Sequence, residues 1–283
     1  MRIRFTKMHG AANDFVVVDH RTPFLPPGRA ALFARLCDRR RGVGADGVLL
    51  LERDPASDFA MRYWNADGEP AEFCGNGARC LAAFALDLGL GRGGEVRFRT
   101  DAGEKRARRL PDGRIALAFG PVDAGEPLAV EAAGRSFAGR RVVTGVPHFV
   151  IPVARVRDVP LAEWAPPLRA HARFGPAGTN VDFVERLAGG AVAMRTFERG
   201  VEGETLACGS GAIACALWAV AEGAAAPVVV RTAGGDDLVV GFESGPDGRR
   251  ATLTGPAEVA FTGEWEAPVG AGTAAGGAGG RGA

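Results

Sequence analysis

The chain has 283 residues, of which 47% are hydrophobic and 24% are charged. This length and balance are typical of a globular protein with two domains of ordinary size. A net charge of +1 gives no support to a nucleic-acid surface. No apolar run forms a signal peptide or approaches the roughly 18 residues of a membrane span. We therefore expect a cytoplasmic protein that binds neither nucleic acid nor membrane.

The cysteines and lysines argue against several kinds of site. There are five cysteines and no Cys-x-x-Cys pair, which favours neither a disulfide scaffold, nor a metal centre, nor disulfide exchange. The only lysines are Lys7 and Lys105. Pyridoxal phosphate needs a Schiff-base lysine, and neither of these lies in a recognisable setting for one. We expect no metal and no cofactor.

In chain order, the first half is predicted to contain short strands, one helix and then further strands. The helix follows the phrase Cys74-Gly75-Asn76-Gly77-Ala78 and runs from Asn76 or Gly77 to Leu88. A Pro-Asp-Gly sequence after it predicts a hairpin turn. The predicted strands of this half are 15–18, 48–51, 59–64, 96–100 and 115–119.

The second half is predicted to repeat this order. Its helix begins at Gly209, within the phrase Cys208-Gly209-Ser210-Gly211-Ala212. Its predicted strands are 142–153, 181–185, 191–197, 228–232, 238–242 and 250–253. Residues 267–283 are rich in glycine and alanine without periodicity, which predicts a disordered tail.

A nearly constant offset relates the two halves, which indicates a duplication. Seven of the sixteen residues that start at Cys74 match those that start at Cys208. Phe15-Val16 matches Phe149-Val150 at an offset of 134, and Ala60-Met61-Arg62 matches Ala193-Met194-Arg195 at 133.

The duplication predicts an α/β (α+β-like) fold of two pseudo-symmetric domains. Each would be a mostly antiparallel or mixed sheet wrapped around a central helix, with the active site in the cleft between them. We expect one domain at 1–122, completed by a last strand near 257–266, and the other at 123–256.

The repeated phrase suits acid–base chemistry on an amino acid. Helix starts present unpaired N–H groups that bind anions such as a carboxylate. The helix dipole contributes up to about 2 kcal/mol there, which would lower a thiol pKa toward neutrality. Two facing sulfurs, one thiolate and one thiol, would remove an α-proton from one face and protonate the other. Cys37, Cys80 and Cys215 are instead expected to be buried core residues, and neither phrase matches a phosphate-binding glycine motif.

Five motifs carry a resemblance to a known family. They are MHGAANDFVVVD (8–19), GVGADG (42–47), NADG (65–68), CGNGARC (74–80) and ERGVEGETLACGSGA (198–212), and together they resemble diaminopimelate epimerase. The resemblance implies an isomerase that interconverts LL- and meso-2,6-diaminopimelate without a cofactor. It also implies a homodimer that supplies lysine and peptidoglycan precursors.

The resemblance also assigns roles to residues. Cys74 and Cys208 match the two catalytic bases, while His148 and Glu198 match positions that orient the substrate and tune the thiols. The matching substrate-binding residues are Asn13, Asn65, Gly75, Asn76, Asn180, Glu198, Arg199, Gly209 and Ser210. An arginine with asparagine amides suits the second amino-carboxylate end of diaminopimelate.

Simpler interpretations of these residues stay open. Asn65 is also typical of a turn, Glu198-Arg199 of a solvated pair, and His148 of a structural histidine. The chain departs from the family pattern at Gly47, where many members carry glutamine, and at Val146, where many carry asparagine. These departures keep two alternatives open: another cofactor-independent amino-acid racemase, and a non-catalytic carboxylate-binding protein.

Overall fold

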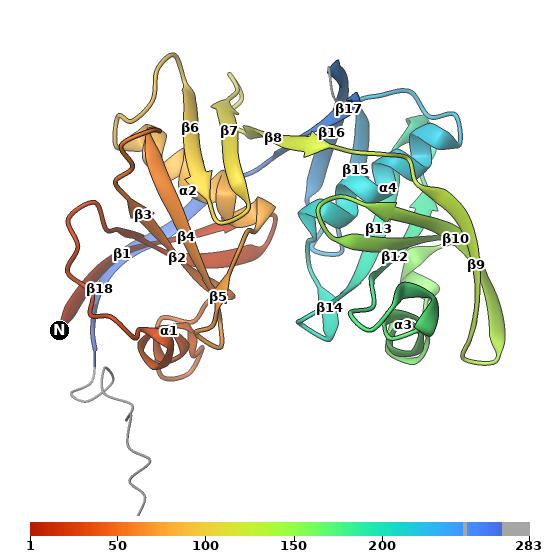
Figure 1. Ribbon diagram of the computed structural model, residues 1–283, viewed down its shortest axis with the longest axis horizontal. Helices are drawn as coiled ribbons and strands as arrows, with labels where there is room; N and C mark the ends of the chain where they lie inside the picture. The colour runs from red at the N-terminus through yellow and green to blue at the C-terminus, as the bar shows by residue number, and fades with distance from the viewer. Residues whose placement is uncertain (246–247, 268–283) are drawn as a thin grey trace, which may run out of the picture.

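The computed structural model describes residues 1–245 and 248–267. The predicted tail at 268–283, and the second copy of the Pro-Asp-Gly turn at 246–247, lie outside the described residues. Two halves lie side by side, each a curved sheet around one helix (Figure 1). The two helices are α2 (Gly75–Asp87) and α4 (Gly209–Ala221). The predicted fold class is confirmed.

The strands of the first half form one continuous sheet. They are β1 (Arg2–Gly10), β2 (Asn13–Asp19), β3 (Gly47–Glu52), β4 (Phe59–Asn65), β5 (Pro70–Ala71), β6 (Glu95–Thr100), β7 (Gly103–Arg109) and β8 (Ile115–Pro121). Most neighbours are antiparallel, but β2 pairs with β3, and β4 with β6, in parallel. The short β5 pairs only with β4 among the described strands.

The second half repeats this arrangement. Its strands are β9 (Glu126–Ala132), β10 (Arg135–Val143), β11 (Pro147–Pro152), β12 (Asn180–Arg186), β13 (Val192–Glu198), β14 (Gly203–Thr205), β15 (Val228–Arg231), β16 (Asp237–Gly245) and β17 (Gly248–Gly255). Here β11 pairs with β12, and β13 with β15, in parallel. β17 also pairs with β8, which joins the sheets of the two halves.

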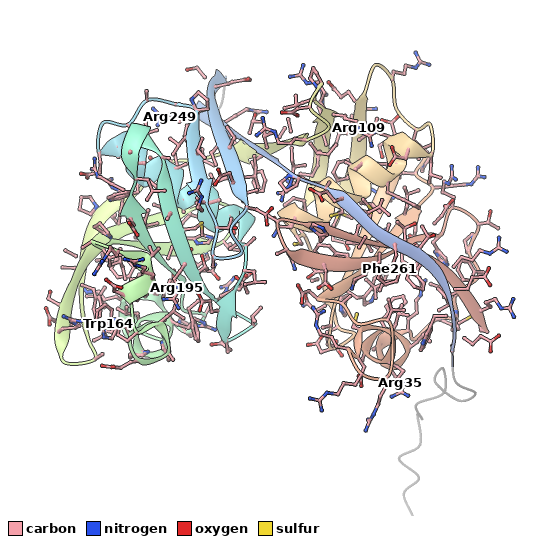
Figure 2. The ribbon with its side chains drawn as sticks, turned by 180° about the vertical axis from the view of Figure 1, so that it is seen from behind. Arg35, Arg109, Trp164, Arg195, Arg249 and Phe261 are labelled. Carbon is pink, nitrogen blue, oxygen red and sulfur yellow. The ribbon has the colours of Figure 1, made fainter. Side chains whose placement is uncertain are left out.

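The last strand, β18 (Glu258–Glu266), returns to the first half and pairs with β1. Seen from behind, it crosses the back of that half (Figure 2). It occupies beside β1 the place that β9 occupies beside β10. We therefore propose that residues 1–122 with 257–266 form one domain and that 123–256 form the other.

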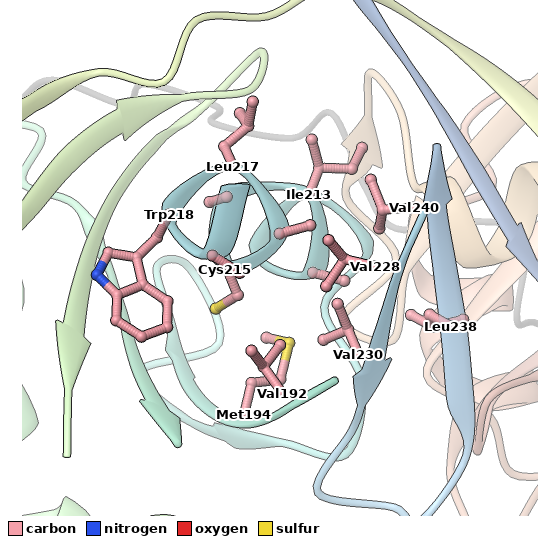
Figure 3. Packing of buried hydrophobic residues seen from close by; sticks show 14 of the residues in the cluster. Val192, Met194, Ile213, Cys215, Leu217, Trp218, Val228, Val230, Leu238 and Val240 are labelled. Atoms are coloured by element: carbon pink, nitrogen blue, oxygen red, sulfur yellow. The ribbon is translucent and has the colours of Figure 1, made fainter. Parts of the chain in front are cut away.

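Each central helix is surrounded by apolar side chains of its own half. The residues of α4 are apolar on nearly all sides, and they pack against Val192, Met194, Val228 and Val230 of the surrounding strands (Figure 3). The corresponding core around α2 includes Phe15 and Leu49. Further helices, α1 (Ala30–Cys37) and α3 (Leu161–Arg169), supply the outer cores of the two halves. No helix in residues 1–245 and 248–267 is long and apolar enough to cross a membrane.

The central helices begin and end close to where the sequence predicts. Both are followed by a glycine in the left-handed region, Gly89 at φ +76° and Gly223 at φ +95°, which is a common way for a helix to stop. The single strand predicted at 142–153 is wrong. The chain turns at Gly145, where φ is +85°, and separates the antiparallel strands β10 and β11. The sequence also did not predict two helices, α1 and α3, or the strands β1, β5, β7, β9 and β14.

Candidate active site

The two repeated cysteines occupy equivalent places at the starts of the central helices. Cys74 and Cys208 are the residues just before α2 and α4, and both have extended backbone conformations. The two helix starts meet, because a Cβ added to Gly209 would lie only 3.8 Å from the Cα of Gly75. Asn76 Nδ2 also donates a hydrogen bond to the carbonyl oxygen of Ala207 across this junction, at 3.1 Å. The structure therefore brings both phrases together.

The surroundings of Cys74 are made of amide groups. Its sulfur donates to Asn13 Oδ1 at 3.6 Å, and Asn76 Nδ2 donates to the same oxygen at 3.1 Å. Asp46 Oδ2 accepts from Asn13 Nδ2 at 2.7 Å. With both ends of its amide engaged, Asn13 presents its carbonyl oxygen, and not its N–H groups, to the thiol.

Arg79 lies behind this group and was not predicted. Its side chain is fully buried, and it donates to Asn76 Oδ1 at 2.9 Å and to the carbonyl oxygens of Gly75 and Pro256, each at 3.4 Å. The corresponding position of α4 is Ile213. The available signal was an arginine next to the apolar run of α2, since an arginine on a helix of this kind is buried only with polar partners.

The surroundings of Cys208 are made of ionisable groups. Ser210 Oγ lies 3.5 Å from the sulfur and 3.0 Å from His148 Nε2. His148 Nδ1 lies 2.7 Å from Asp182 Oδ2, and both side chains are fully buried. Thr196 Oγ1 donates to Asp182 Oδ1 at 2.7 Å.

Asp182 and Thr196 were also missed by the sequence prediction. The signal for Asp182 was a charged residue between apolar residues of strand β12. A charged residue at such a place needs a partner nearby.

Burial dominates the ionisation of both thiols. It raises the pKa of Cys74 to about 11, although the backbone N–H groups of Gly77 and Asn76 act in the opposite direction. Burial also raises the pKa of Cys208 well above its usual value, and the negative charges of Glu198 and Asp182 add to the effect. The expectation that the helix starts alone would bring a thiol near neutrality was wrong, because desolvation of the charged form outweighs the dipole.

Glu198 is the last residue of β13 and lies near both thiols. Its carboxylate raises the pKa of each cysteine, so it acts electrostatically on the two sides of the site. Burial raises the pKa of Glu198 itself, although the nearby Thr205 side chain acts in the opposite direction. It makes no ion pair with Arg199, so these two residues are not a solvated pair.

The remaining predicted residues differ in what they contact. Asn180 is buried and braces the backbone, because its Nδ2 donates to Pro147 O at 3.0 Å and its Oδ1 accepts from Arg199 N at 2.8 Å. Arg199 is half-buried and forms no salt bridge within residues 1–245 and 248–267. Asn65 is exposed at the end of β4, where its carbonyl oxygen accepts from Gly68 N in a turn.

Gly47 pairs with Asn65 across β3 and β4. A Cβ at Gly47 would lie 2.5 Å from the carbonyl oxygen of Trp64 and 2.6 Å from the ring of Tyr63. No side chain fits there unless the backbone moves. The departure from glutamine at this position is therefore built into the packing of the strands.

The chain is similar to known proteins in both sequence and fold. The family model described as diaminopimelate epimerase matches residues 5–125 and 141–259. Diaminopimelate epimerase of Aquifex aeolicus is 38% identical over 273 residues, which covers 92% of this chain and 97% of that protein. The enzyme of the same name from Desulforudis audaxviator is 42% identical over 283 residues, with 93% and 99% covered.

Solved structures with similar folds are more distant in sequence. A hydroxyproline epimerase from Agrobacterium vitis, with bound trans-4-hydroxy-L-proline, has a TM-score of 0.64 at 20% identity and covers 97% of this chain and 96% of its own. A Bacillus anthracis protein of the PhzF family has a TM-score of 0.69 at 16% identity and covers 94% of this chain and 99% of its own. At these identities the likeness concerns the fold alone.

Proposed function

The chain belongs to the diaminopimelate epimerase family, and from this premise we propose that it interconverts LL- and meso-2,6-diaminopimelate by a two-base mechanism. The observation that carries the proposal is the pair of cysteines at two helix starts that meet. An α-carboxylate on the N–H groups of both starts would place its α-carbon between the two sulfurs. One sulfur would take the α-proton while the other protonates the opposite face. No cofactor is required.

The helix starts also favour the transition state. Negative charge grows on the α-carboxylate as the carbanion forms, and the backbone N–H groups at Gly75, Asn76, Gly209 and Ser210 would stabilise it. Glu198 is close enough to influence both thiols, which suits a residue that also accepts from the substrate ammonium group. We place the activity in the cytoplasm, in the supply of lysine and peptidoglycan precursors.

The second amino-carboxylate end of the substrate would bind beside Asn65 and Arg199. The Arg199 guanidinium is available for a bidentate contact with a carboxylate. Asn180 would act mainly through the backbone of Arg199, which it holds. Asn13 would contribute beside Cys74, as its carbonyl oxygen already does.

A second candidate substrate is another amino acid without this distal end. The crowded backbone at Gly47 favours it, because no side chain at that position can contact the substrate. The two candidates differ in a simple way, since only diaminopimelate has a second charged end for Arg199 to hold.

An exchange assay in deuterated water tests the proposal. The reduced protein is incubated with LL-diaminopimelate and no added cofactor, and in parallel with proline, glutamate and lysine. We expect meso product with deuterium at the inverted α-carbon. Absence of both deuteration and meso product would exclude diaminopimelate, and exchange confined to another amino acid would support the second candidate.

Replacement of each thiol tests the two-base mechanism. Cys74→Ser and Cys208→Ser are each expected to lower kcat by about 10²- to 10⁴-fold, a usual loss for a misplaced or poor general acid or base. Cys37→Ala is the matched control, because Cys37 is a free buried cysteine in the outer core around α1. Full turnover in either site variant would show that its sulfur transfers no proton.

A further inference from the structure

The two halves of the site differ at three equivalent positions. Strand register pairs Phe15 with Gly47 in the first half and His148 with Asn180 in the second. Gly47 corresponds to Asn180 at an offset of 133 residues. The strand partners of these two residues, Phe15 and His148, are therefore equivalent at the same offset. The sequence match of Phe15-Val16 with Phe149-Val150 at 134 was wrong by one residue.

The same register assigns the neighbours of His148. Leu49 pairs with Tyr63 across β3 and β4, and Asp182 pairs with Thr196 across β12 and β13. Each strand faces the first turn of its helix, because a Cβ on Gly77 would lie 3.1 Å from Leu49 Cδ2, and one on Gly211 would lie 2.6 Å from Asp182 Oδ1. Leu49 and Asp182 are thus equivalent.

Phe15, Leu49 and Tyr63 lie beside α2 in the first half. At the equivalent places beside α4 the second half has a polar trio. Phe15 and Tyr63 pack edge to face at 6.1 Å in the first half. The first half forms the same fold with this packing, so the fold does not require the polar trio at these places. Burying a charge there is costly unless it is paired. The polar trio of His148, Asp182 and Thr196 needs a functional reason.

Hydrogen-bond chemistry determines which nitrogen of His148 carries the proton. Asp182 Oδ1 accepts from Thr196, and Asp182 Oδ2 faces His148 Nδ1 at 2.7 Å. A carboxylate oxygen only accepts, so Nδ1 must donate. In the neutral imidazole, Nε2 then offers a lone pair to Ser210 Oγ at 3.0 Å.

Ser210 extends this chain to the sulfur of Cys208. A hydroxyl donates once and can accept as well. Ser210 therefore donates to His148 Nε2 and accepts from the Cys208 S–H, whose sulfur lies 3.5 Å away. When the S–H bond breaks, its proton forms a new O–H bond on Ser210 as the former hydroxyl proton bonds to Nε2. A thiol and an imidazole become a thiolate and an imidazolium, with no change in net charge.

We propose that Asp182 is a positioning residue that holds His148 in the tautomer able to take the Cys208 proton through Ser210. The proposal rests on the proposed function and assigns part of its machinery. Because the transfer stays inside the group, Cys208 can become a thiolate without exchanging a proton with water. The Asp182 carboxylate stabilises the imidazolium that results. In the first half, Phe15 and Leu49 can accept no proton from Cys74.

The charged and titratable groups around His148 come from three elements. Asp182 lies on β12, Glu198 on β13, and Cys208 at the start of α4, which also carries Cys215. Burial raises the pKa of Cys208 and of Cys215 well above the usual value, so proton loss to solvent is unfavourable at either thiol. An acceptor inside the group removes that obstacle for Cys208 alone, because only Cys208 is joined to it by Ser210.

The first test reads the tautomer in the intact protein. Long-range proton–nitrogen NMR on histidine-labelled protein distinguishes the two ring nitrogens, and His148→Gln identifies the signal among the four histidines. We expect Nδ1 of His148 to be protonated, with Nε2 either free or carrying the transferred proton. An unprotonated Nδ1 would overturn the proposal, whatever the activity of any variant.

The second test replaces Asp182 by asparagine, which keeps the shape and removes the charge. The amide would donate to Nδ1 and force the other tautomer. We expect kcat to fall by about 10²- to 10⁴-fold, as for loss of a general base, while KM changes little. Alkylation of Cys208 by iodoacetamide should slow at least about tenfold, with Cys74 as the internal reference that changes little.

The matched control is Thr196→Val, which removes the other hydrogen bond to Asp182 but leaves the contact with Nδ1 in place. We expect it to retain the wild-type tautomer and to lose less activity than Asp182→Asn. Asp182→Asn with normal kcat and normal alkylation of Cys208 would overturn the proposal. Wild-type protein inactive on diaminopimelate would instead count against the proposed function, and the tautomer measurement would still stand.

Discussion

Asn13 is held beside Cys74 by a network of charges beneath it. Asp14, the next residue, pairs with Lys7 Nζ at 2.6 Å and with Arg39 at 2.6 Å. Arg39 also pairs with Asp46, which accepts from Asn13. Lys7 is nearly buried, with 8% of its side chain exposed, and it also contacts the carbonyl oxygen of Gly44. Asp14 therefore compensates a buried charge and supports one wall of the site.

Asp14→Asn is expected to destabilise the protein by about 3 kcal/mol at pH 7, because it leaves the Lys7 charge buried without its partner. Burial alone would raise the pKa of Asp14, but Arg39 and Lys7 outweigh it and lower the pKa to about 2. A lowered folded-state pKa gives stability that is fully present well above the usual value of 3.8 and is lost progressively as pH falls from about 3.8 to about 2. The difference between variant and wild type should therefore shrink in acid.

Urea unfolding of both proteins from pH 7 down to pH 3 measures this. Asp112→Asn is the control, because Asp112 is exposed and pairs only with Arg114 among the described residues. A difference that stays constant from pH 7 to pH 3 would mean that the Asp14 charge is not the source of the stability.

At the scale of elements, two hairpin turns are built from unusual residues. Ala11 and Ala12 have φ of +58° and +63° between β1 and β2, and Ala133 and Gly134 have φ of +49° and +70° between β9 and β10. Two-residue turns of this kind favour Asn-Gly, because other side chains are strained there. The first of these turns carries Asn13 into the site.

Ala133→Asn is expected to stabilise the protein by about 0.5–1 kcal/mol, because asparagine tolerates the left-handed conformation better than alanine. Ala133 is exposed, so no packing is disturbed. Gly134→Ala is the opposing control and should destabilise by about 1 kcal/mol. Urea midpoints report both changes. A variant at 133 that is less stable than wild type would show that this backbone is not strained.

These turns explain why some elements could not be predicted. β1 and β9 were missed because an Ala-Ala or Ala-Gly turn lacks the sequence signature that marks a hairpin. The central helices were predicted closely, since Gly-rich starts and the glycines at 89 and 223 mark both ends. The long strand predicted at 142–153 failed because its apolar pattern does not show the turn at Gly145.

The site was predicted to a similar extent. Both cysteines and their glycines follow from the repeat, and the structure brings them together. The Asp182–His148 pair did not follow, because the repeated Phe-Val matches by sequence at an offset of 134, whereas the paired strands are offset by 133. A slip of one residue moves every side chain of a strand to the other face. Only strand pairing shows that His148 faces α4 rather than the outer core.

At the scale of the whole molecule, the back of the first half presents an open strand edge. Among the described residues, β18 pairs only with β1. Val259 and Phe261 on this strand are 52% and 50% exposed, and Phe261 lies on the face seen in Figure 2. Free apolar edges are normally covered or blunted. We propose that a second copy of the chain covers this one, so that the protein is a homodimer.

Phe261→Glu is expected to prevent that association, because it would bury a charge at the centre of the contact. In analytical ultracentrifugation the wild type should sediment at twice the chain mass of 29.3 kDa, and the variant at the chain mass itself. Val143→Glu is the matched control, since Val143 is also 50% exposed but lies on β10 of the other half. It should remain dimeric.

The position of β18 also allows the effect of association on catalysis to be tested, because no residue of β18 contacts either thiol. One outcome is that the monomeric variant loses turnover while Cys74 and Cys208 still alkylate at wild-type rates. In that case association would support turnover by restraining movement of the first half as a whole, and not by changing the thiols. A wild type that sediments as a monomer would instead leave the β18 edge uncovered and refute the dimer.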